Sequence, residues 1–133
     1  MITGWITNKG KVIVCGTYEH FNVEDETLVN IWKPYEEQIG SAYQACEDLA
    51  NEGEHPEWHN YEMCQDDCQR RAYDDAYKLG YLRLTSLNPR GELPRIAVEG
   101  LPQWIESHKI IIKELADKYE CGIKTFPVKI NKY

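Results

Sequence analysis

Basic residues are scarce in the middle of this 133-residue sequence. Residues 19–75 hold only three of the fifteen lysines and arginines, but sixteen of the twenty-two aspartates and glutamates. That segment therefore carries a formal charge of −13, and the rest of the chain carries +6. A charge distribution of this kind repels nucleic acid and attracts cations or basic protein surfaces. Direct binding to a phosphate backbone needs clustered lysine and arginine, so we expect none.

Signals for membranes and disulfides are missing as well. No apolar run approaches the roughly 20 residues that span a bilayer, and the N-terminus lacks the basic and then apolar pattern of a signal peptide. The five cysteines are an odd number and form no Cys-x-x-Cys pair, which is typical of free thiols in a reducing compartment. We therefore expect a cytoplasmic protein that does not contact a membrane and that folds as a single domain over residues 1–133.

Catalytic motifs are also absent from the sequence. There is no Gly-x-Ser-x-Gly elbow and no Gly-rich phosphate loop. Adjacent carboxylates such as Asp66 and Asp67 point about 100° apart on a helix, which does not suit an acid–base pair. The sequence therefore leaves enzymatic activity open and favours a non-catalytic role.

Turn residues and hydrophobic periodicity divide the chain into strands and helices. The predicted elements are strands over 4–7 and 11–15, a helix from Thr27 that kinks or starts again at Pro34, a helix from Pro56 to Leu79, strands over 81–85 and 95–99, a helix from Leu101 to about Glu120, and a strand over 123–130. Gly53, Gly80 and Gly122 are expected to follow the helix ends. The order ββ-αα-ββ-α-β predicts an α+β domain, with helices packed on one face of a small, largely antiparallel sheet.

The two central helices are predicted to pack against each other as an antiparallel hairpin. On the first, a helical stripe is formed by Tyr35, Ile39, Ala42, Cys46 and Leu49. On the second, we assign one side to the core, formed by Trp58, Tyr61, Cys68, Ala72, Ala76 and Leu79. A second face spans roughly 80° and holds His59, Glu62, Asp66, Arg70, Tyr73 and Tyr77. This side is expected to be exposed, either as a solvated face whose tyrosines pack on the preceding helix or as a contact surface.

A contact surface here would combine this helix face with the acidic loop over residues 16–26. The predicted contact residues are Glu24, Asp25, Glu26, Glu57, Glu62, Asp66, Asp74, Tyr73 and Tyr77. Their charge fits a partner protein with a basic surface, for example one that forms a basic nucleic-acid channel, and predicts rapid, salt-sensitive association.

A metal site is the main alternative. His55, His59, Cys64 and Cys68 have suitable atoms for zinc, but on one helix His59 and Cys64 lie roughly 140° apart, and both thiols fall on or beside the apolar side. A more feasible set for zinc or another divalent metal is His55, His59 and Glu62, joined by His20 or Cys15. These histidines and Glu62 predict a small metal-dependent hydrolase or a pocket for a small ligand.

His108 is the fourth histidine and lies among apolar residues of its predicted helix. A histidine in this setting is typical of a core residue with one satisfied hydrogen bond. The alternative is an acid or base that lines a pocket.

Several segments together resemble small proteins of unassigned function in phages and prophages. They are Gly4-Trp5-Ile6-Thr7 with Lys9, Gly10, Cys15 and His20; His55-Pro56-Glu57-Trp58-His59 with Tyr61, Glu62 and Met63; Tyr77 with Gly80-Tyr81-Leu82-Arg83; and Val98-Glu99-Gly100. The resemblance covers most of the chain and implies an accessory protein that acts in the bacterial cytoplasm, as an inhibitor or modulator of host or defence machinery. It implies no catalytic residue, and Cys64 and Cys68 lie outside its pattern.

Overall fold

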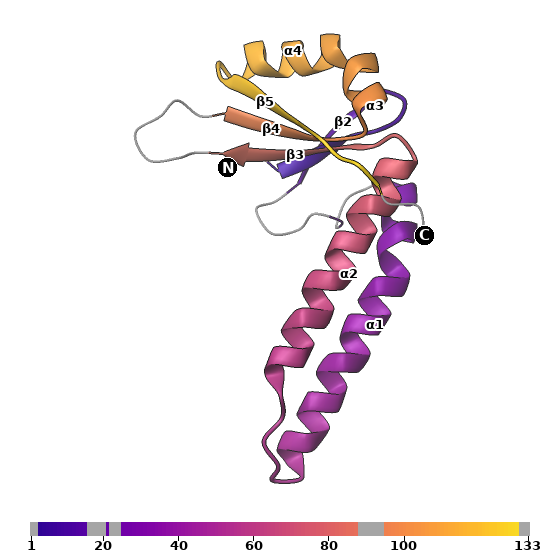
Figure 1. Ribbon diagram of the computed structural model, residues 1–133, viewed down its shortest axis with the longest axis vertical. Helices are drawn as coiled ribbons and strands as arrows, with labels where there is room; N and C mark the ends of the chain where they lie inside the picture. The colour runs from indigo at the N-terminus through magenta and orange to yellow at the C-terminus, as the bar shows by residue number, and fades with distance from the viewer. Residues whose placement is uncertain (1–2, 16–20, 22–24, 88–94, 131–133) are drawn as a thin grey trace. The chain divides into compact units, whose positions relative to one another are not determined.

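The computed structural model describes residues 3–15, 21, 25–87 and 95–130, and it divides into two compact units (Figure 1). Asp25–Asp75 form one, the hairpin unit, while Met1–Glu24 and Ala76–Tyr133 form the other, the sheet unit. The elements follow the predicted order ββ-αα-ββ-α-β, with the last helix in two pieces, so the predicted α+β class is confirmed. A single domain over residues 1–133 stays a prediction.

Two long helices make up the hairpin unit. Helix α1 spans Glu26–Asn51, and helix α2 spans Trp58–Lys78, of which the last three residues belong to the sheet unit. The two helices run antiparallel, as predicted (Figure 1). The Asp25 carboxylate caps α1 by accepting a hydrogen bond from the Leu28 N–H at 3.0 Å. Gly53 follows the end of α1 with φ +81°, as expected of the glycine after a helix.

Pro34 lies inside α1, so no new helix begins there. Proline lacks an N–H and costs about 3 kcal/mol in a helix interior. Contacts to α2 beyond this position offset part of that cost. The Tyr35 hydroxyl donates to the Asp75 carboxylate at 2.5 Å, and the Cys68 thiol donates to the side-chain oxygen of Gln38 at 3.3 Å. These contacts favour one continuous helix.

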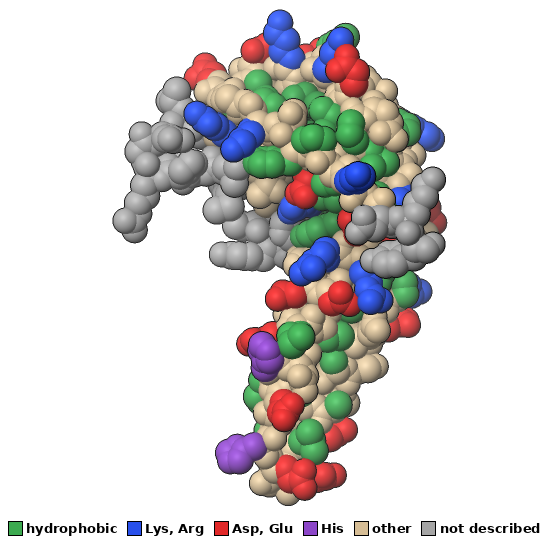
Figure 2. Space-filling view, in the orientation of Figure 1, with side chains coloured by type: hydrophobic (Ala, Val, Ile, Leu, Met, Phe, Trp, Pro, Cys, Tyr) green, Lys and Arg blue, Asp and Glu red, His purple; other side chains and the backbone are tan. Residues whose placement is uncertain are grey.

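Burial along the hairpin is sparse. Leu28 and Cys46 are the two buried residues of the 26-residue α1. The predicted core positions Cys68, Ala72 and Ala76 on α2 are confirmed as buried. Trp58 on α2 and Leu79, which follows its end, are exposed, so their assignment to the core is wrong. Two helices cover only one stripe of each other, which is narrower than the apolar side predicted here. Figure 2 shows acidic and hydrophobic side chains side by side along the hairpin.

Five strands form one sheet in the sheet unit. They are β1 (Thr3–Ile6), β2 (Val12–Cys15), β3 (Leu82–Leu87), β4 (Arg95–Gly100) and β5 (Gly122–Pro127), in the spatial order β2-β1-β3-β4-β5. All neighbours pair antiparallel except β4 and β5, which are parallel. The sheet is therefore largely antiparallel, and β5 with Pro127 lies at its edge, both as predicted. The turn predicted over 88–91 lies outside the described residues.

Helices α3 (Pro102–Ser107) and α4 (Lys109–Lys118) cover one face of this sheet (Figure 1). The core between them comprises Ile6, Leu82, Leu84, Ile96, Val98, Ile112 and Leu115. Burying one such side chain contributes roughly 1.5–3 kcal/mol. The single helix predicted here is interrupted at His108, whose φ of −106° and ψ of 18° are not helical. The segment still provides the crossover that a parallel strand pair requires.

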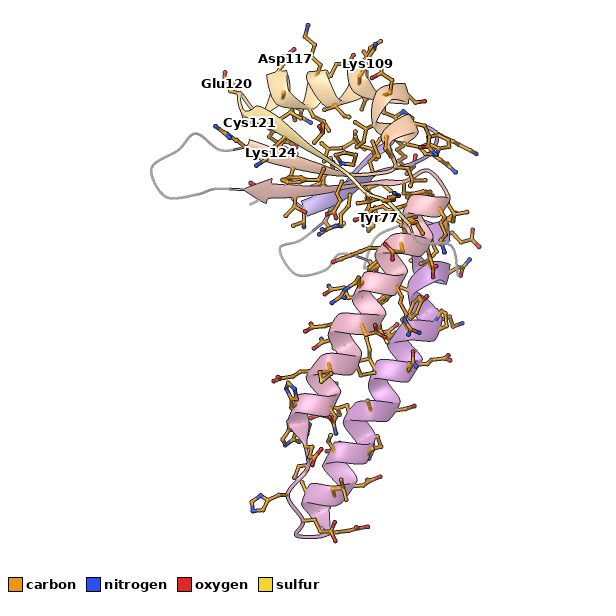
Figure 3. All side chains as sticks on the ribbon, viewed as in Figure 1. Tyr77, Lys109, Asp117, Glu120, Cys121 and Lys124 are labelled. Atoms are coloured by element: carbon orange, nitrogen blue, oxygen red, sulfur yellow. The ribbon has the colours of Figure 1, made fainter. Side chains whose placement is uncertain are left out.

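Helix α4 ends at a non-glycine residue in the left-handed conformation. Glu120, labelled in Figure 3 between α4 and β5, has φ +49°. The predicted cap, Gly122, instead opens β5. The Glu120 N–H donates to the Asp117 carbonyl at 3.3 Å, and the Cys121 N–H donates to the Ala116 carbonyl at 3.0 Å. These are the two bonds of a Schellman cap, so the predicted position of the cap is wrong by two residues. A side chain in this conformation costs roughly 1–2 kcal/mol.

Replacing Glu120 by glycine should therefore stabilise the sheet unit. We expect Glu120→Gly to raise the free energy of unfolding by roughly 1 kcal/mol, because relief of backbone strain outweighs the extra unfolded-state entropy of glycine. Urea unfolding followed by circular dichroism measures this change. Gly122→Ala is the control, since Gly122 lacks a positive φ, and we expect a change within about 0.5 kcal/mol. A destabilised Glu120→Gly variant would contradict the strain at this cap.

Candidate functional site

The acidic face predicted on α2 is on the surface. Glu62 and Asp66 lie one helical turn apart, and both are exposed. Arg70, a further turn along, is exposed as well. Arg71 pairs with Asp67 at 3.1 Å on an adjacent side of the helix. The middle of α2 therefore presents an exposed acidic surface, as the sequence predicts.

The other acidic residues of the predicted contact surface do not form one patch with this face. Asp25 and Glu26 lie at the start of α1, whereas Glu57 precedes α2 at the opposite end of the antiparallel hairpin. A rise of 1.5 Å per residue places these ends roughly 30–40 Å apart. Asp25 is also engaged as the cap of α1, and Glu24 lies outside the described residues. The compact part of the predicted surface is the exposed side of α2.

Tyr77 is buried, so its expected exposure is wrong. Its side chain is only 2% exposed, and its ring lies 6.4 Å from that of Trp5. The Tyr77 hydroxyl also accepts a hydrogen bond from Arg83 Nε at 3.1 Å. The last turn of α2 belongs to the sheet unit and packs there. A helical wheel drawn over the whole helix assumes the same surroundings for every turn, so it does not predict this burial. Tyr73 and Asp74, also predicted contact residues, are half-buried.

Three aromatic side chains meet at the loop end of the hairpin. The ring centroids lie 5.5 Å apart for Tyr43 and Trp58, 5.4 Å for Tyr43 and Tyr61, and 6.2 Å for Trp58 and Tyr61, all in tilted or edge-on pairs. Aromatic rings attract each other in this geometry. Yet Tyr43 is 46% exposed and Trp58 is 40% exposed. We call these three residues the aromatic cluster. Tyr43 is not among the residues predicted from the sequence, although it follows Ile39 by four residues beside the predicted stripe.

An open groove of about 430 Å³ lies beside the aromatic cluster. Its lining residues are Ala42, Ala45, Cys46, Leu49, His55, Glu57, Asn60 and Tyr61. Two contacts hold the connecting loop at this groove. The Cys46 thiol donates to the Glu57 carbonyl at 3.8 Å, and the Asn60 side chain donates to the Glu57 carboxylate at 2.8 Å. The groove thus brings together a predicted contact residue, Glu57, and a predicted metal ligand, His55.

The predicted metal ligands are not assembled into a site by the residues that the structure describes. His55, His59 and Glu62 are exposed, and His20 lies outside the described residues. Within 3–15, 21, 25–87 and 95–130, no group of three His, Cys, Asp or Glu side chains is placed to hold a metal ion. The hydrolase interpretation therefore has no assembled site in this part of the chain.

The two cysteines of α2 lie at the helix seam, as predicted. Cys68 is buried, and its sulfur lies 4.0 Å from that of Cys64. Burial, together with a hydrogen bond to Cys64, raises the pKa of Cys68 to about 11. Cys68 is therefore a protonated thiol at neutral pH and acts as a small packing residue.

His108 is buried in the break between α3 and α4. Its ring lies against Trp104, with centroids 5.7 Å apart. Its Nε2 atom has no hydrogen-bond partner among the described residues. The core position predicted for His108 is confirmed, but one polar atom of its ring is unsatisfied, which costs about 1–3 kcal/mol.

Phenylalanine at position 108 should stabilise the sheet unit. The His108→Phe ring keeps the contact with Trp104 and removes the unsatisfied nitrogen, so we expect the free energy of unfolding to rise by roughly 1 kcal/mol. Thermal and urea unfolding report this change. His55→Phe, at an exposed position, controls for a general effect of added apolar surface. Lower stability of His108→Phe would show that the imidazole makes a favourable polar contact.

Tyr35 makes the stability of the hairpin unit sensitive to alkaline pH. Burial, together with the hydrogen bond to Asp75, raises the pKa of Tyr35 from its usual value of 10.0 to about 12. Below pH 10 the tyrosine is protonated in both the folded and the unfolded chain, and its contribution is fully present. Between pH 10 and 12 the unfolded chain loses this proton first, so stability falls as the pH rises.

Tyr35→Phe should reduce this alkaline loss. We expect the variant to be less stable than the wild type by roughly 1 kcal/mol at pH 7, because one hydrogen bond is lost, and to show a shallower decline above pH 10. Urea unfolding at a series of pH values measures both effects. An unchanged slope above pH 10 would assign the alkaline decline to other groups.

Comparisons of the chain with protein-family models, with curated proteins and with solved structures found no match in any of the three. No helix among the described residues is long and apolar enough to cross a membrane. The resemblance to phage proteins stays a prediction.

Proposed function

We propose that this chain is a phage-type accessory protein that binds a host protein stoichiometrically, through the hairpin unit, as an inhibitor or modulator of host or defence machinery. The observation that supports this most is the charge of that unit. Residues 25–75 contain fourteen acids and three bases, a formal charge of −11. So much charge of one sign on two helices attracts a basic surface and raises the rate of encounter with it.

The exposed side of α2 is the proposed centre of the contact. Glu62 and Asp66 lie one turn apart on the surface, so both carboxylates can face one basic patch. Acidic residues arranged along a helix resemble a row of phosphates in charge. A host protein whose basic channel binds nucleic acid is therefore the class of partner that fits.

Aromatic residues supply the part of the binding energy that charge alone does not. Electrostatic complementarity mainly sets specificity and the association rate, whereas Trp and Tyr are enriched among residues whose loss costs most binding energy. Because Tyr77 is buried, the exposed Trp58 and Tyr43 take the role of anchors in this proposal. Tyr73 is half-buried and belongs to the margin of the surface.

Reversing two charges on α2 tests the proposal. Partners are captured from bacterial lysate at low salt, identified and expressed, and their affinity for the chain is measured by calorimetry over a series of salt concentrations. We expect a 1:1 complex that weakens steeply with salt. The double variant Glu62→Lys with Asp66→Lys should weaken binding by roughly tenfold or more.

A matched control separates the α2 face from overall charge. Glu114→Lys with Asp117→Lys makes the same change in net charge at two exposed positions of α4. We expect this variant to bind within about twofold of the wild type. Equal weakening by both pairs would assign the effect to net charge alone. Full binding by the Glu62 and Asp66 variant would contradict the proposed surface.

A further inference from the structure

The groove at the loop end of the hairpin has a floor of small side chains and a polar margin. Ala42 and Ala45 of α1 leave the space open, while Leu49 is 37% exposed at its side. A volume of about 430 Å³ lies within the range in which sites receive a ligand or a large side chain. The groove therefore has room for an apolar group that this unit does not itself supply.

We propose that the groove and the aromatic cluster form the recognition site for a basic amphipathic helix of the partner protein, which inserts leucine-type side chains between α1 and α2. This inference rests on the proposed function and identifies the partner's binding element by its chemistry. It places the specific part of the contact at the loop end of the hairpin and not along the whole acidic face.

The apolar lining indicates the side chains that enter. Ala42, Ala45 and Leu49 follow one another at helical spacing, so they form a strip along α1. A helix that lies along such a strip presents side chains at i, i+3 and i+4, which is the usual way in which a groove binds an amphipathic helix. An aliphatic side chain placed there removes the exposed apolar surface of Leu49 from water.

The margin of the groove indicates the charge that flanks these apolar side chains. The Glu57 carboxylate is held in place by Asn60 at 2.8 Å, so it is a positioned acceptor for a lysine or arginine. Tyr43 and Trp58 of the aromatic cluster are partly exposed, and aromatic rings attract the same cations. The unit's charge of −11 excludes an acidic partner and favours a basic one.

The aromatic cluster is arranged before any partner arrives. All three of its ring pairs are in contact, with centroid separations between 5.4 and 6.2 Å. Rings that already restrict each other lose little conformational freedom on binding. This arrangement supports a binding site more than it supports a set of unrelated surface aromatics.

A pair of synthetic peptides tests the inference with the full chain. One is a short, amidated, helix-forming peptide of alanine, lysine and arginine with leucines at i and i+4, and the other replaces both leucines by serine at the same charge. We expect the leucine peptide to bind the wild-type protein about tenfold more tightly than the serine peptide, by calorimetry and by a change in tryptophan emission.

Filling the groove should remove this preference. Ala45→Trp places a large ring in the groove, at an exposed position that does not support the fold. We expect this variant to bind the leucine peptide about tenfold more weakly than the wild type does, and to bind the serine peptide with unchanged affinity. Gln44→Trp is the matched control, since Gln44 is the exposed neighbour that does not line the groove, and it should bind both peptides as the wild type does. Circular dichroism checks that both variants keep their helices.

The remaining outcomes separate this inference from the proposed function. Equal, salt-sensitive binding of both peptides would overturn the groove as a recognition site and leave the attraction of the hairpin for basic partners in place. If neither peptide binds but the charge-dependent complex still forms in lysate, the groove is not the recognition site, and the proposed function is unaffected. Self-association of the wild type that Ala45→Trp abolishes, seen by light scattering, would identify a second copy as the occupant and overturn the inference.

Discussion

Each helix of a two-helix hairpin has one neighbour, so only one stripe of its surface can be covered by the other helix. In this hairpin unit the covered stripe is narrow and partly polar. Leu28 and Cys46 are the buried residues of α1, and the Tyr35–Asp75 hydrogen bond lies in the same seam. Large apolar side chains that a three-layer protein would enclose, such as Trp58, therefore remain at the surface. The exposed aromatic cluster follows directly from this limit.

The charge of the hairpin unit affects both the stability of its fold and its binding to a partner. Fourteen acids and three bases on residues 25–75 repel one another in the free protein, which reduces the stability of a compact state. A basic partner makes the electrostatic contribution of these acids favourable, because its positive charges neutralise the repulsion between them. Any ligand that binds the folded chain alone also stabilises the fold by mass action. Folding and partner binding in this unit are therefore linked through charge as well as through contact area.

Local signals predicted much of this structure, and contacts between distant segments account for the errors. Gly53 and Gly80 were placed correctly at helix ends, since a left-handed residue is a local requirement. The cap at Glu120 was missed, because the chain there accepts a strained residue where glycine was expected. Tyr77 was misplaced since α2 passes from the hairpin unit into the sheet unit at Ala76, and a helical wheel assumes one environment throughout. The parallel pairing of β4 with β5 depends on register between distant segments, which periodicity does not specify.

The two units differ in how far packing constrains their residues. The sheet unit encloses an apolar core between one face of the sheet and α4, so most of its sequence is constrained by packing. The hairpin unit instead fixes its helices by directed bonds, such as the Cys46 thiol with the Glu57 carbonyl and Asn60 with the Glu57 carboxylate. These bonds shape the groove without filling it. A surface held in place but not filled loses little entropy when a partner binds. The loop end of the hairpin is therefore suited to specific recognition, while the exposed carboxylates of α2 attract the basic partner.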